Sequence, residues 1–402
     1  MSLVVDAFAP AKLGPLTLRN RIIKAATFEG RTPHRVVTDE LIDFHRAVAA
    51  GGVGMSTVAY CAISREGTTD GHQIVLTEDA VAGLRRLTEA IHAEGAAASA
   101  QIGHAGPVAN PAGTRRAALA PSRFLTPFMR RTKAMTDSDF ERITHDFVRG
   151  ARTAVESGFD ALEIHLGHNY LLSSFLSPKL NKRTDGWGGT LENRARFPRE
   201  VVRVVRKAAG PRVVLIAKLN MDDGVAGGFQ PEESLRFAQM LQDDESIDAL
   251  ELTGGSSLNN PMYLFKGEAP LREFGATLPT FMRLGFRLVG HRLFRSYPFE
   301  EAYFRDTARA FKDALELPVI LLGGINKVET IRDAVDEGFA FVAMARALLS
   351  DPGLVNKMRA GEATVSRCDH RNRCLPTIYA GTRCLLVGDD TDRLSPEGRG
   401  EA

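Results

Sequence analysis

Short apolar strands and amphipathic helices alternate along this chain eight times, and no other feature constrains its fold as strongly. We predict strands at apolar runs rich in β-branched side chains: 21–26, 55–59, 97–101, 161–165, 213–219, 249–253, 319–322 and 341–344. Helices are predicted where apolar residues recur every three or four positions: 39–50, 80–93, 137–156, 191–209, 233–243, 304–315, 328–337 and 353–360. Because the strands are continuous apolar runs, we expect a parallel sheet covered by helices.

Eight strand–helix pairs predict an α/β fold of the (β/α)8 or TIM barrel type, whose functional residues lie at the C-terminal ends of the strands. A doubly wound open sheet is the competing fold, but no Gly-x-Gly-x-x-Gly motif follows the first strand. The chain has 402 residues, more than the about 250 of a typical barrel. We predict that the surplus forms long loops over the barrel mouth, at 102–135, 166–190 and 254–303.

Composition argues against several classes of protein. A formal net charge of +2 indicates neither nucleic acid nor an anionic membrane as a partner. No apolar run reaches the roughly 18 residues of a membrane span, and the N-terminus lacks the pattern of a signal peptide. Four cysteines in so long a chain do not form a disulfide framework. We therefore expect a soluble, cytoplasmic protein, and we leave its oligomeric state open, with a homo-oligomer as one option.

Polar residues follow the predicted strands at the points where the strands end. They are Thr27, Gln101, His104, His165, His168, Tyr170, Lys218, Gly323, Gly324, Ala345 and Arg346. In a barrel, these residues would meet at one mouth. The two glycines would let a phosphate approach backbone N–H groups, and Arg346 would add positive charge, so a phosphate-bearing cofactor is expected. A Gly-Gly pair considered alone is more often only a turn.

The segment HLGHNYL, residues 165–171, places two histidines and a tyrosine directly after a strand. Zinc binding is one interpretation, but no HExxH motif or third ligand accompanies the histidines. Histidines satisfied inside the core are a second interpretation, and Tyr170 considered alone is more typical of packing. The residue types by themselves leave these alternatives open.

The longer segment HLGHNYLLSSFLSPKLNKRTDGWGGTLENRARF resembles the hallmark of the old yellow enzyme family, the NADH:flavin oxidoreductases. The family pattern has a histidine pair followed by Tyr, FLSP, N-x-R-x-D, a Gly-Gly pair and E-N-R-x-R-F. The resemblance extends over nearly the whole chain, through FAPAKLGPLTLRNRIIKAAT, AQIGHAG, IAKLN, LLGGIN and AMARALLSDP. It implies a (β/α)8 barrel that holds non-covalent FMN, in agreement with the fold predicted from the strand pattern.

The resemblance also implies roles for the residues of the HLGHNYL segment. His165 and His168 match the pair that binds the activating oxygen of the substrate, and Tyr170 matches the proton donor. Hydride from the flavin reaches the β-carbon, and the charge that builds on the oxygen needs N–H donors, as in an oxyanion hole. A phenol, with a reference pKa of about 10, stays protonated at neutral pH and can deliver a proton.

For the cofactor, the resemblance implies that FMN contacts residues at several strand ends: Ala26, Thr27, Tyr60, Gln101, Lys218, Gly323, Gly324, Ala345 and Arg346. A cation near the pyrimidine edge of the flavin stabilises the reduced ring, which gives Lys218 a role. Many relatives have Arg there, so Lys218 keeps the charge but loses the planar fork. Tyr60 replaces a small residue of many relatives, and Ala25-Ala26 stands where relatives often have Pro-Met or Pro-Leu.

The tail carries CDHRNRCLPTIYAGTRC, with Cys368, Cys374 and Cys384. Larger relatives hold an iron–sulfur cluster in this region, but Arg371 occupies the second cysteine position, so one ligand is missing. A zinc site that includes His370 has unusual spacing, and free buried thiols are the default. We predict no metal. We divide the chain into an FMN-binding barrel, residues 1–361, and a tail, residues 362–402, that is packed on the barrel or extends from it.

The resemblance implies an FMN-dependent oxidoreductase that transfers hydride from NADH or NADPH, through FMN, to the activated C=C of an α,β-unsaturated carbonyl compound. An electron-poor alkene and a nicotinamide cofactor are therefore the expected small-molecule partners. An alternative is the same flavin barrel acting as a dienoyl reductase, dehydrogenase or demethylase with another electron partner. An alternative of another class is a non-catalytic FMN-barrel binding protein. The sequence names neither the physiological substrate nor the preferred nicotinamide.

Overall fold

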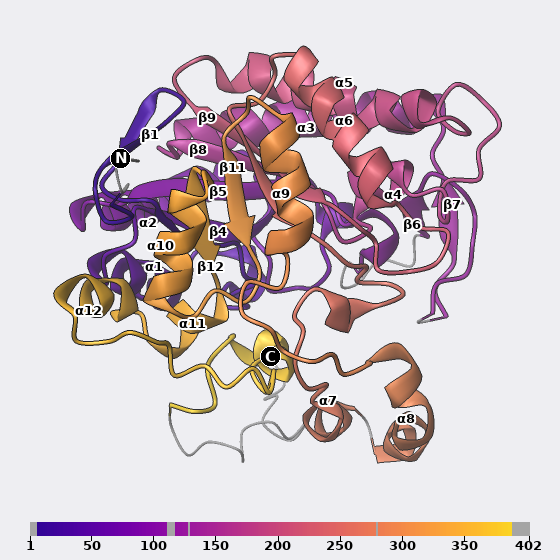
Figure 1. Cartoon of the computed structure of the whole chain (residues 1–402). Helices are drawn as coiled ribbons and strands as arrows, with labels where there is room; N and C mark the ends of the chain where they lie inside the picture. The colour runs from indigo at the N-terminus through magenta and orange to yellow at the C-terminus, as the bar shows by residue number, and fades with distance from the viewer. Residues whose placement is uncertain (1–5, 111–116, 128, 279, 388–402) are drawn as a thin grey trace.

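Eight parallel strands close into a barrel in the computed structural model, which describes residues 6–110, 117–127, 129–278 and 280–387 (Figure 1). In their order around the barrel, the strands are β3 (Ile22–Lys24), β4 (Met55–Ala62), β5 (Ala97–Gly103), β8 (Ala161–Leu166), β9 (Val214–Asn220), β10 (Ala249–Thr253), β11 (Val319–Leu322) and β12 (Phe341–Met344). The predicted (β/α)8 fold is confirmed. Three predicted strands, 249–253, 319–322 and 341–344, have the observed bounds.

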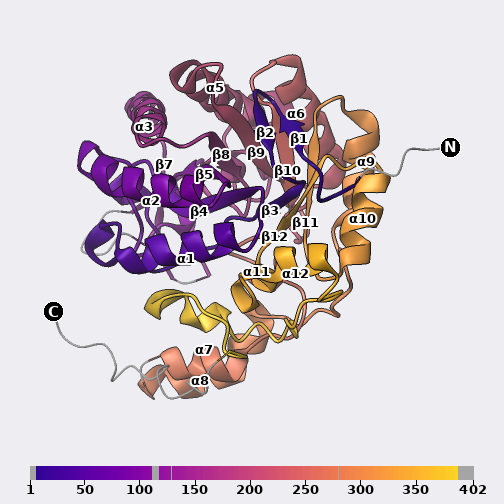
Figure 2. The same ribbon diagram turned by 90° about the vertical axis from the view of Figure 1, so that its left-hand side faces the viewer.

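Helices surround the barrel on its outside, as Figure 2 shows. They are α1 (Asp39–Ala50), α2 (Val81–Ala93), α3 (Asp137–Glu156), α5 (Leu191–Ala209), α6 (Pro231–Asp243), α9 (Arg305–Ala314), α10 (Val328–Asp336), α11 (Arg346–Ser350) and α12 (Leu354–Ala360). The apolar stripe of each long helix faces the sheet; in α3, for example, Phe140, Ile143 and Phe147 are buried. A carboxylate fixes the start of this helix, since Asp139 Oδ2 accepts a hydrogen bond from the Thr136 N–H at 3.0 Å.

The three long segments over the mouth contain short elements that the sequence pattern did not predict. They are β6 (Ala118–Ala120), which pairs in parallel with β7 (Thr132–Ala134), and the helices α4 (Leu171–Leu176), α7 (Leu271–Thr277) and α8 (Thr280–Leu293). The long segments that the sequence predicted over the mouth therefore contain regular elements of their own. The two strands and α4 are too short to show a periodicity, and tertiary contacts decide their conformation.

A hairpin of β1 (Ala11–Leu13) and β2 (Leu16–Leu18) closes the N-terminal end of the barrel. Its Leu13 and Leu18 are buried in one apolar cluster with barrel residues such as Ile216, Ile320 and Phe341. A larger cluster fills the space between the strands and the helices. The cluster that includes the hairpin contains residues near the starts of the barrel strands. The polar side chains therefore lie toward the opposite end of the barrel.

Short 3-10 helices complete the described structure: η1 (Pro33–Arg35), η2 (Arg65–Gly67), η3 (Glu78–Ala80), η4 (Gly106–Val108), η5 (Pro261–Tyr263) and η6 (Leu375–Ala380). The described part of the tail lies against loops that follow the strands. The Ser366 N–H donates to the Asn326 carbonyl at 2.9 Å, and the Thr382 N–H donates to the Glu29 carbonyl at 2.8 Å. The predicted domain division at residue 361 stays a prediction. Within the described ranges, no helix is long and apolar enough to cross a membrane.

Candidate active site

The residues predicted for the site come from every barrel strand except β10, and all of them lie at or just beyond the C-terminal end of a strand. Tyr60, Gln101, His165 and Lys218 lie on strands, and the other members follow strands. Cross-strand register brings two of them together, because His165 and Lys218 are direct neighbours on β8 and β9. The closed barrel therefore gathers the predicted residues at one mouth, as parallel strands require.

Four rings form a compact group at this mouth. The His165 ring centroid lies 4.4 Å from that of Tyr170 and 5.0 Å from that of His168. Tyr60 packs edge-on to Tyr170, at 5.4 Å and 88°, and its hydroxyl donates to the Gly67 carbonyl at 3.3 Å. The structure therefore places Tyr60 beside the three residues of the HLGHNYL segment.

Two residues that the sequence reading missed hold His168 in place. The Asn220 side-chain oxygen accepts a hydrogen bond from the His168 N–H at 3.0 Å, and Thr253 Oγ1 lies 2.9 Å from His168 Nε2. His168 needs this support because its φ is +60°, in the left-handed region. Gly167 leaves the required space, since a Cβ there would lie 3.1 Å from both Asn220 and Thr253. Thr253 ends β10, so that strand also contributes to the site.

Both imidazoles are neutral at neutral pH. Burial lowers the pKa of His165 well below its ordinary value, and the neighbouring His168 and Lys218 lower it further. Burial, followed by the charge of Lys218, lowers the pKa of His168 to about 3. Within the described chain, the buried Nδ1 of His165 has no hydrogen-bond partner. An unsatisfied buried ring nitrogen is costly, so this atom is suited to a ligand.

Charged side chains fill the barrel interior beneath the rings. The Lys218 ammonium contacts the Glu251 carboxylate and lies 3.7 Å from Glu163 Oε1. Gln101 Nε2 donates to the same Glu163 oxygen at 2.6 Å. Burial and then Glu251 raise the pKa of Glu163 to about 8, although Lys218 acts in the opposite direction. Burial lowers the pKa of Lys218, but the negative charges of Glu163 and Glu251 have the larger combined effect. The pKa of Lys218 is therefore raised.

A second buried ion pair lies on the β3 side of the mouth. Lys24 Nζ lies 2.6 Å from Glu29 Oε1, and Glu29 Oε2 accepts the Ala59 N–H at 3.1 Å. His45 Nε2 is 3.4 Å from the same carboxylate. Burial opposes ionisation of Glu29, but Lys24 outweighs it and lowers the pKa of this carboxyl. The sequence reading missed this network; its signal was a lysine inside the apolar strand sequence IIK.

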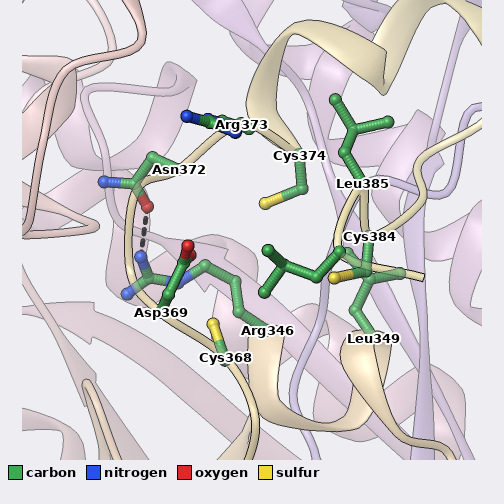
Figure 3. A pocket seen from close by; sticks show the side chains of 10 residues that line it. Arg346, Leu349, Cys368, Asp369, Asn372, Arg373, Cys374, Cys384 and Leu385 are labelled. Carbon is green, nitrogen blue, oxygen red and sulfur yellow. Dashed lines mark hydrogen bonds between the residues drawn. The ribbon is translucent and has the colours of Figure 1, made fainter. Parts of the chain in front are cut away.

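The residues predicted to bind the phosphate of the cofactor follow β11 and β12. Gly323 and Gly324 have φ of +111° and +71°, and a Cβ on Gly324 would approach Tyr303 to 2.6 Å. Only glycine fits these positions without strain. The Arg346 guanidinium donates to the Asn372 side-chain oxygen, as Figure 3 shows, and also to the Phe265 carbonyl. Arg346 is thus held by the tail and by the segment that follows β10.

Three thiols face a small hollow beside Arg346. Figure 3 shows the sulfur atoms of Cys368, Cys374 and Cys384 around this hollow. Burial raises the pKa of the Cys374 thiol to about 12. Arg371 points away as an exposed side chain, with its Nε 3.5 Å from Asp369 Oδ2. Among the residues that the structure describes, no group of three His, Cys, Asp or Glu side chains could hold a metal ion.

The donors at the mouth fit a flavin mononucleotide. Gln101 and Lys218 offer an amide and an ammonium, which suit the acceptor atoms of the flavin's pyrimidine edge. His165 Nδ1 is buried without a partner in the described chain, and Arg346 offers a positive charge for the phosphate. The residues present therefore suit the predicted cofactor, and the individual contacts stay predictions.

Comparisons with known proteins agree with this geometry. The model of the NADH:flavin oxidoreductase / NADH oxidase family matches residues 6–254. The 4,4'-dithiodibutanoate disulfide reductase of Rhodococcus erythropolis is 56% identical over 380 residues, 94% of this chain and 94% of that protein. The multifunctional alkene reductase/demethylase OYE of Caballeronia cordobensis is 30% identical over 373 residues, 88% of this chain but 50% of that protein. The chain thus spans about half the length of that second relative.

A solved structure extends the comparison to three dimensions. The complex of 2-naphthoyl-CoA reductase with 2-naphthoyl-CoA superposes with a TM-score of 0.82 at 25% identity. The match covers 97% of this chain and 58% of the other. The similarity therefore includes most of the tail as well as the barrel.

Proposed function

This chain belongs to the NADH:flavin oxidoreductase / NADH oxidase family, and from that premise we propose that it reduces an electron-poor acceptor, in the first place the C=C bond of an α,β-unsaturated carbonyl compound. The predicted family is confirmed, and with it an FMN-dependent NAD(P)H oxidoreductase with FMN and a nicotinamide as cofactors. FMN, when bound, supplies the hydride chemistry. The acceptor and the work of each residue belong to the proposal.

One observation supports the proposal most strongly: two neutral imidazoles and a phenol lie side by side at the mouth, with ring centroids 4.4 Å and 5.0 Å from His165. Neutral imidazole can donate an N–H to a carbonyl oxygen and stabilise the negative charge that develops there. In this proposal, Tyr170 gives its proton to the α-carbon. The net reaction adds two electrons and two protons across C=C, and the nicotinamide is oxidised.

A second candidate acceptor is an organic disulfide. It is favoured by the 56% identity to a disulfide reductase, which covers 94% of both chains. Hydride addition to one sulfur breaks the S–S bond and releases the other sulfur as a thiolate, which takes up a proton. The balance is one NAD(P)H, one proton and one disulfide in, and NAD(P)⁺ and two thiols out. Tyr170 or an imidazole would then protonate a leaving thiolate instead of a carbon.

One experiment separates these candidates. The purified protein is bleached anaerobically with NADH or NADPH and then mixed with cyclohexenone or with a dicarboxylate disulfide such as 4,4'-dithiodibutanoate. Reoxidation by the enone at the higher kcat/KM supports alkene reduction, and the reverse order supports disulfide reduction. A protein that reacts with neither acceptor but passes electrons to dyes would favour the dehydrogenase alternative. A colourless protein that no flavin restores would overturn the whole proposal.

A further inference from the structure

The ammonium assigned to the flavin already has a partner in this structure. Lys218 and Glu251 are direct cross-strand neighbours on β9 and β10, and their charged groups are in contact. Both side chains are almost fully buried, with 4% and 1% exposed. Water therefore screens neither charge.

The distances between the buried charged groups at the mouth show which carboxylate pairs with which ammonium group. Two ammonium groups, Lys24 and Lys218, share the interior with three carboxyl groups. Glu29 neutralises Lys24 at 2.6 Å, and Glu251 neutralises Lys218. Glu163 is the carboxyl left over; it sits 3.7 Å from Lys218 and takes a hydrogen bond from Gln101. At neutral pH the pair beneath the mouth is therefore Lys218 and Glu251, with a net charge near zero.

From this geometry we infer that Glu251 is a positioning residue for the cofactor: it holds the Lys218 ammonium in place and cancels its charge, which lowers the midpoint potential of bound FMN. The inference rests on the proposed function, in which Lys218 lies at the pyrimidine edge of the flavin. Reduction adds negative charge to the flavin, so a bare cation would favour the reduced form. Glu251 removes most of that advantage and keeps the bound flavin a stronger reductant.

A role in packing alone is a weaker explanation of Glu251. An apolar residue opposite Lys218 would fill the space, but it would leave a buried ammonium with only Glu163 as a partner.

The test compares the potential of bound FMN in the variant Glu163→Gln and in the double variant Glu163→Gln/Glu251→Gln, measured by anaerobic reduction against a reference dye at pH 7. Glu163 is replaced in both proteins because its pKa would fall once Glu251 no longer raised it, and its carboxylate would then neutralise Lys218 in place of Glu251. Each substitution keeps the shape of the side chain, and the second removes the charge of Glu251. At short range and low screening, one unit charge shifts a neighbouring charge equilibrium by at least about tenfold. We expect the ratio of reduced to oxidised flavin to rise about tenfold, or about 30 mV for a two-electron couple.

Glu163→Gln is the matched control, because it replaces the neighbouring carboxyl that carries a proton at pH 7. At pH 7, its ratio of reduced to oxidised flavin should stay within about threefold of the wild-type ratio. Glu251→Asp, which retains the charge, should restore most of the wild-type potential. An unchanged or lowered potential in Glu163→Gln/Glu251→Gln relative to Glu163→Gln would overturn the inference, and so would an equal rise on going from wild type to Glu163→Gln.

A second double variant keeps the inference testable if Glu163→Gln/Glu251→Gln fails to fold. Lys218→Met together with Glu251→Gln removes both buried charges and leaves no unpaired ion. Its potential should match wild type, because the net charge is near zero in both proteins. A fall of about tenfold in the ratio would show that Lys218 acts as an uncompensated cation and would overturn the inference. Wild-type protein that binds no FMN would instead overturn the proposed function on which the inference rests.

Discussion

At neutral pH the imidazoles of His165 and His168 each carry a single N–H, because burial lowers the pKa of both rings. Each ring can therefore donate one hydrogen bond and accept one. Nε2 of His168 is engaged with Thr253 at 2.9 Å, whereas Nδ1 of His165 has no partner in the described chain. The two histidines are thus not equivalent, and a hydroxyl group fixes the ring orientation of the second.

Replacing Tyr170 with Phe tests the division of labour among these rings. Reduction of the flavin by NAD(P)H should be nearly unchanged, while reoxidation by cyclohexenone should slow by about 10²–10⁴, the usual contribution of a general acid. Stopped-flow absorbance of the two half-reactions measures both rates. Tyr60→Phe is the control, since its hydroxyl donates to the Gly67 carbonyl at 3.3 Å. Slow reduction with normal reoxidation in Tyr170→Phe would mean that this residue positions the nicotinamide instead.

Glu163 should make the stability of the protein depend on pH. Its pKa is raised from 4.5 to about 8 in the folded state, chiefly by burial and then by Glu251. Between these values the folded state binds more protons than the unfolded state, so the free energy of unfolding should fall as pH rises from about 4.5 to about 8, by up to about 1.4 kcal/mol per pH unit. Urea unfolding at several pH values measures this slope. The slope should be smaller in Glu163→Gln, and equal slopes in both proteins would refute the assignment.

At the scale of elements, the described part of the tail packs against the loops at the barrel mouth. Arg346 begins α11 and donates to Asn372 in the tail and to the Phe265 carbonyl. On the other side, the Thr382 N–H donates to the Glu29 carbonyl at 2.8 Å. The tail therefore contacts the strand-end loops of β3 and β12, the two strands that close the barrel.

Replacing Arg346 with Ala should weaken the retention of FMN without altering its visible spectrum, because the lost contact is to the phosphate. A hydrogen bond to a charged group contributes about 1.5–3 kcal/mol, so the Kd should rise roughly 10- to 100-fold. Fluorescence titration of the apoprotein measures the Kd of FMN and of riboflavin. Arg373→Ala, an arginine on the same hollow that pairs with Glu273 at 3.5 Å, is the control. An equal loss for riboflavin would mean that Arg346 serves only to anchor the tail.

We also predict that the tail holds no iron–sulfur cluster. Cys368, Cys374 and Cys384 face one hollow, but the second cysteine position of the motif holds Arg371, whose exposed side chain cannot ligate iron. Anaerobically prepared protein should contain no more than traces of iron and acid-labile sulfide. Both in stoichiometric amounts, with absorbance near 400 nm that survives removal of the flavin, would contradict this prediction.

At the scale of the whole molecule, regular alternation made the barrel predictable, and short or buried polar features did not follow from it. The bounds of α1, α3 and α5 were predicted correctly because their apolar stripes extend over several turns. The strands β6 and β7 have three residues each and carry no readable period. Tertiary contacts alone specify such elements.

The predicted site residues do lie at one mouth, but the residues that support them were missed. Glu251 and Thr253, on β10, act through Lys218 on β9 and His168 after β8. Glu29 acts through Lys24, five residues before it. A charged residue inside an apolar strand was the available signal, as in IIK and ALELT. Its partner could not be read without the register, because a charge on one strand can pair with several neighbours around the barrel.

Loss of the cofactor should lower the stability of the entire barrel. A ligand that binds only the folded state adds RT ln(1 + [L]/Kd), about 2.7 kcal/mol at a free concentration of 100 Kd. Thermal unfolding of apoprotein with increasing FMN should therefore show a melting temperature that climbs with the logarithm of FMN concentration. Equal concentrations of adenosine monophosphate, a phosphate ester without the flavin, should have no such effect. A melting temperature that ignores FMN would mean that the cofactor contacts do not depend on the closed barrel.

The pairing of β3 with β12 has a consequence for folding during synthesis on the ribosome. Arg21 donates to the Ala340 carbonyl across 319 positions of sequence, so this junction can close only after residues as far as β12 have left the ribosome. The residues proposed to contact FMN lie on both sides of the junction, Thr27 beyond β3 and Ala345 beyond β12. A nascent chain therefore cannot capture the cofactor early, and until then its unpaired strand edges are exposed to aggregation. The supply of FMN in the cell would thus affect the yield of this protein only after the barrel has closed.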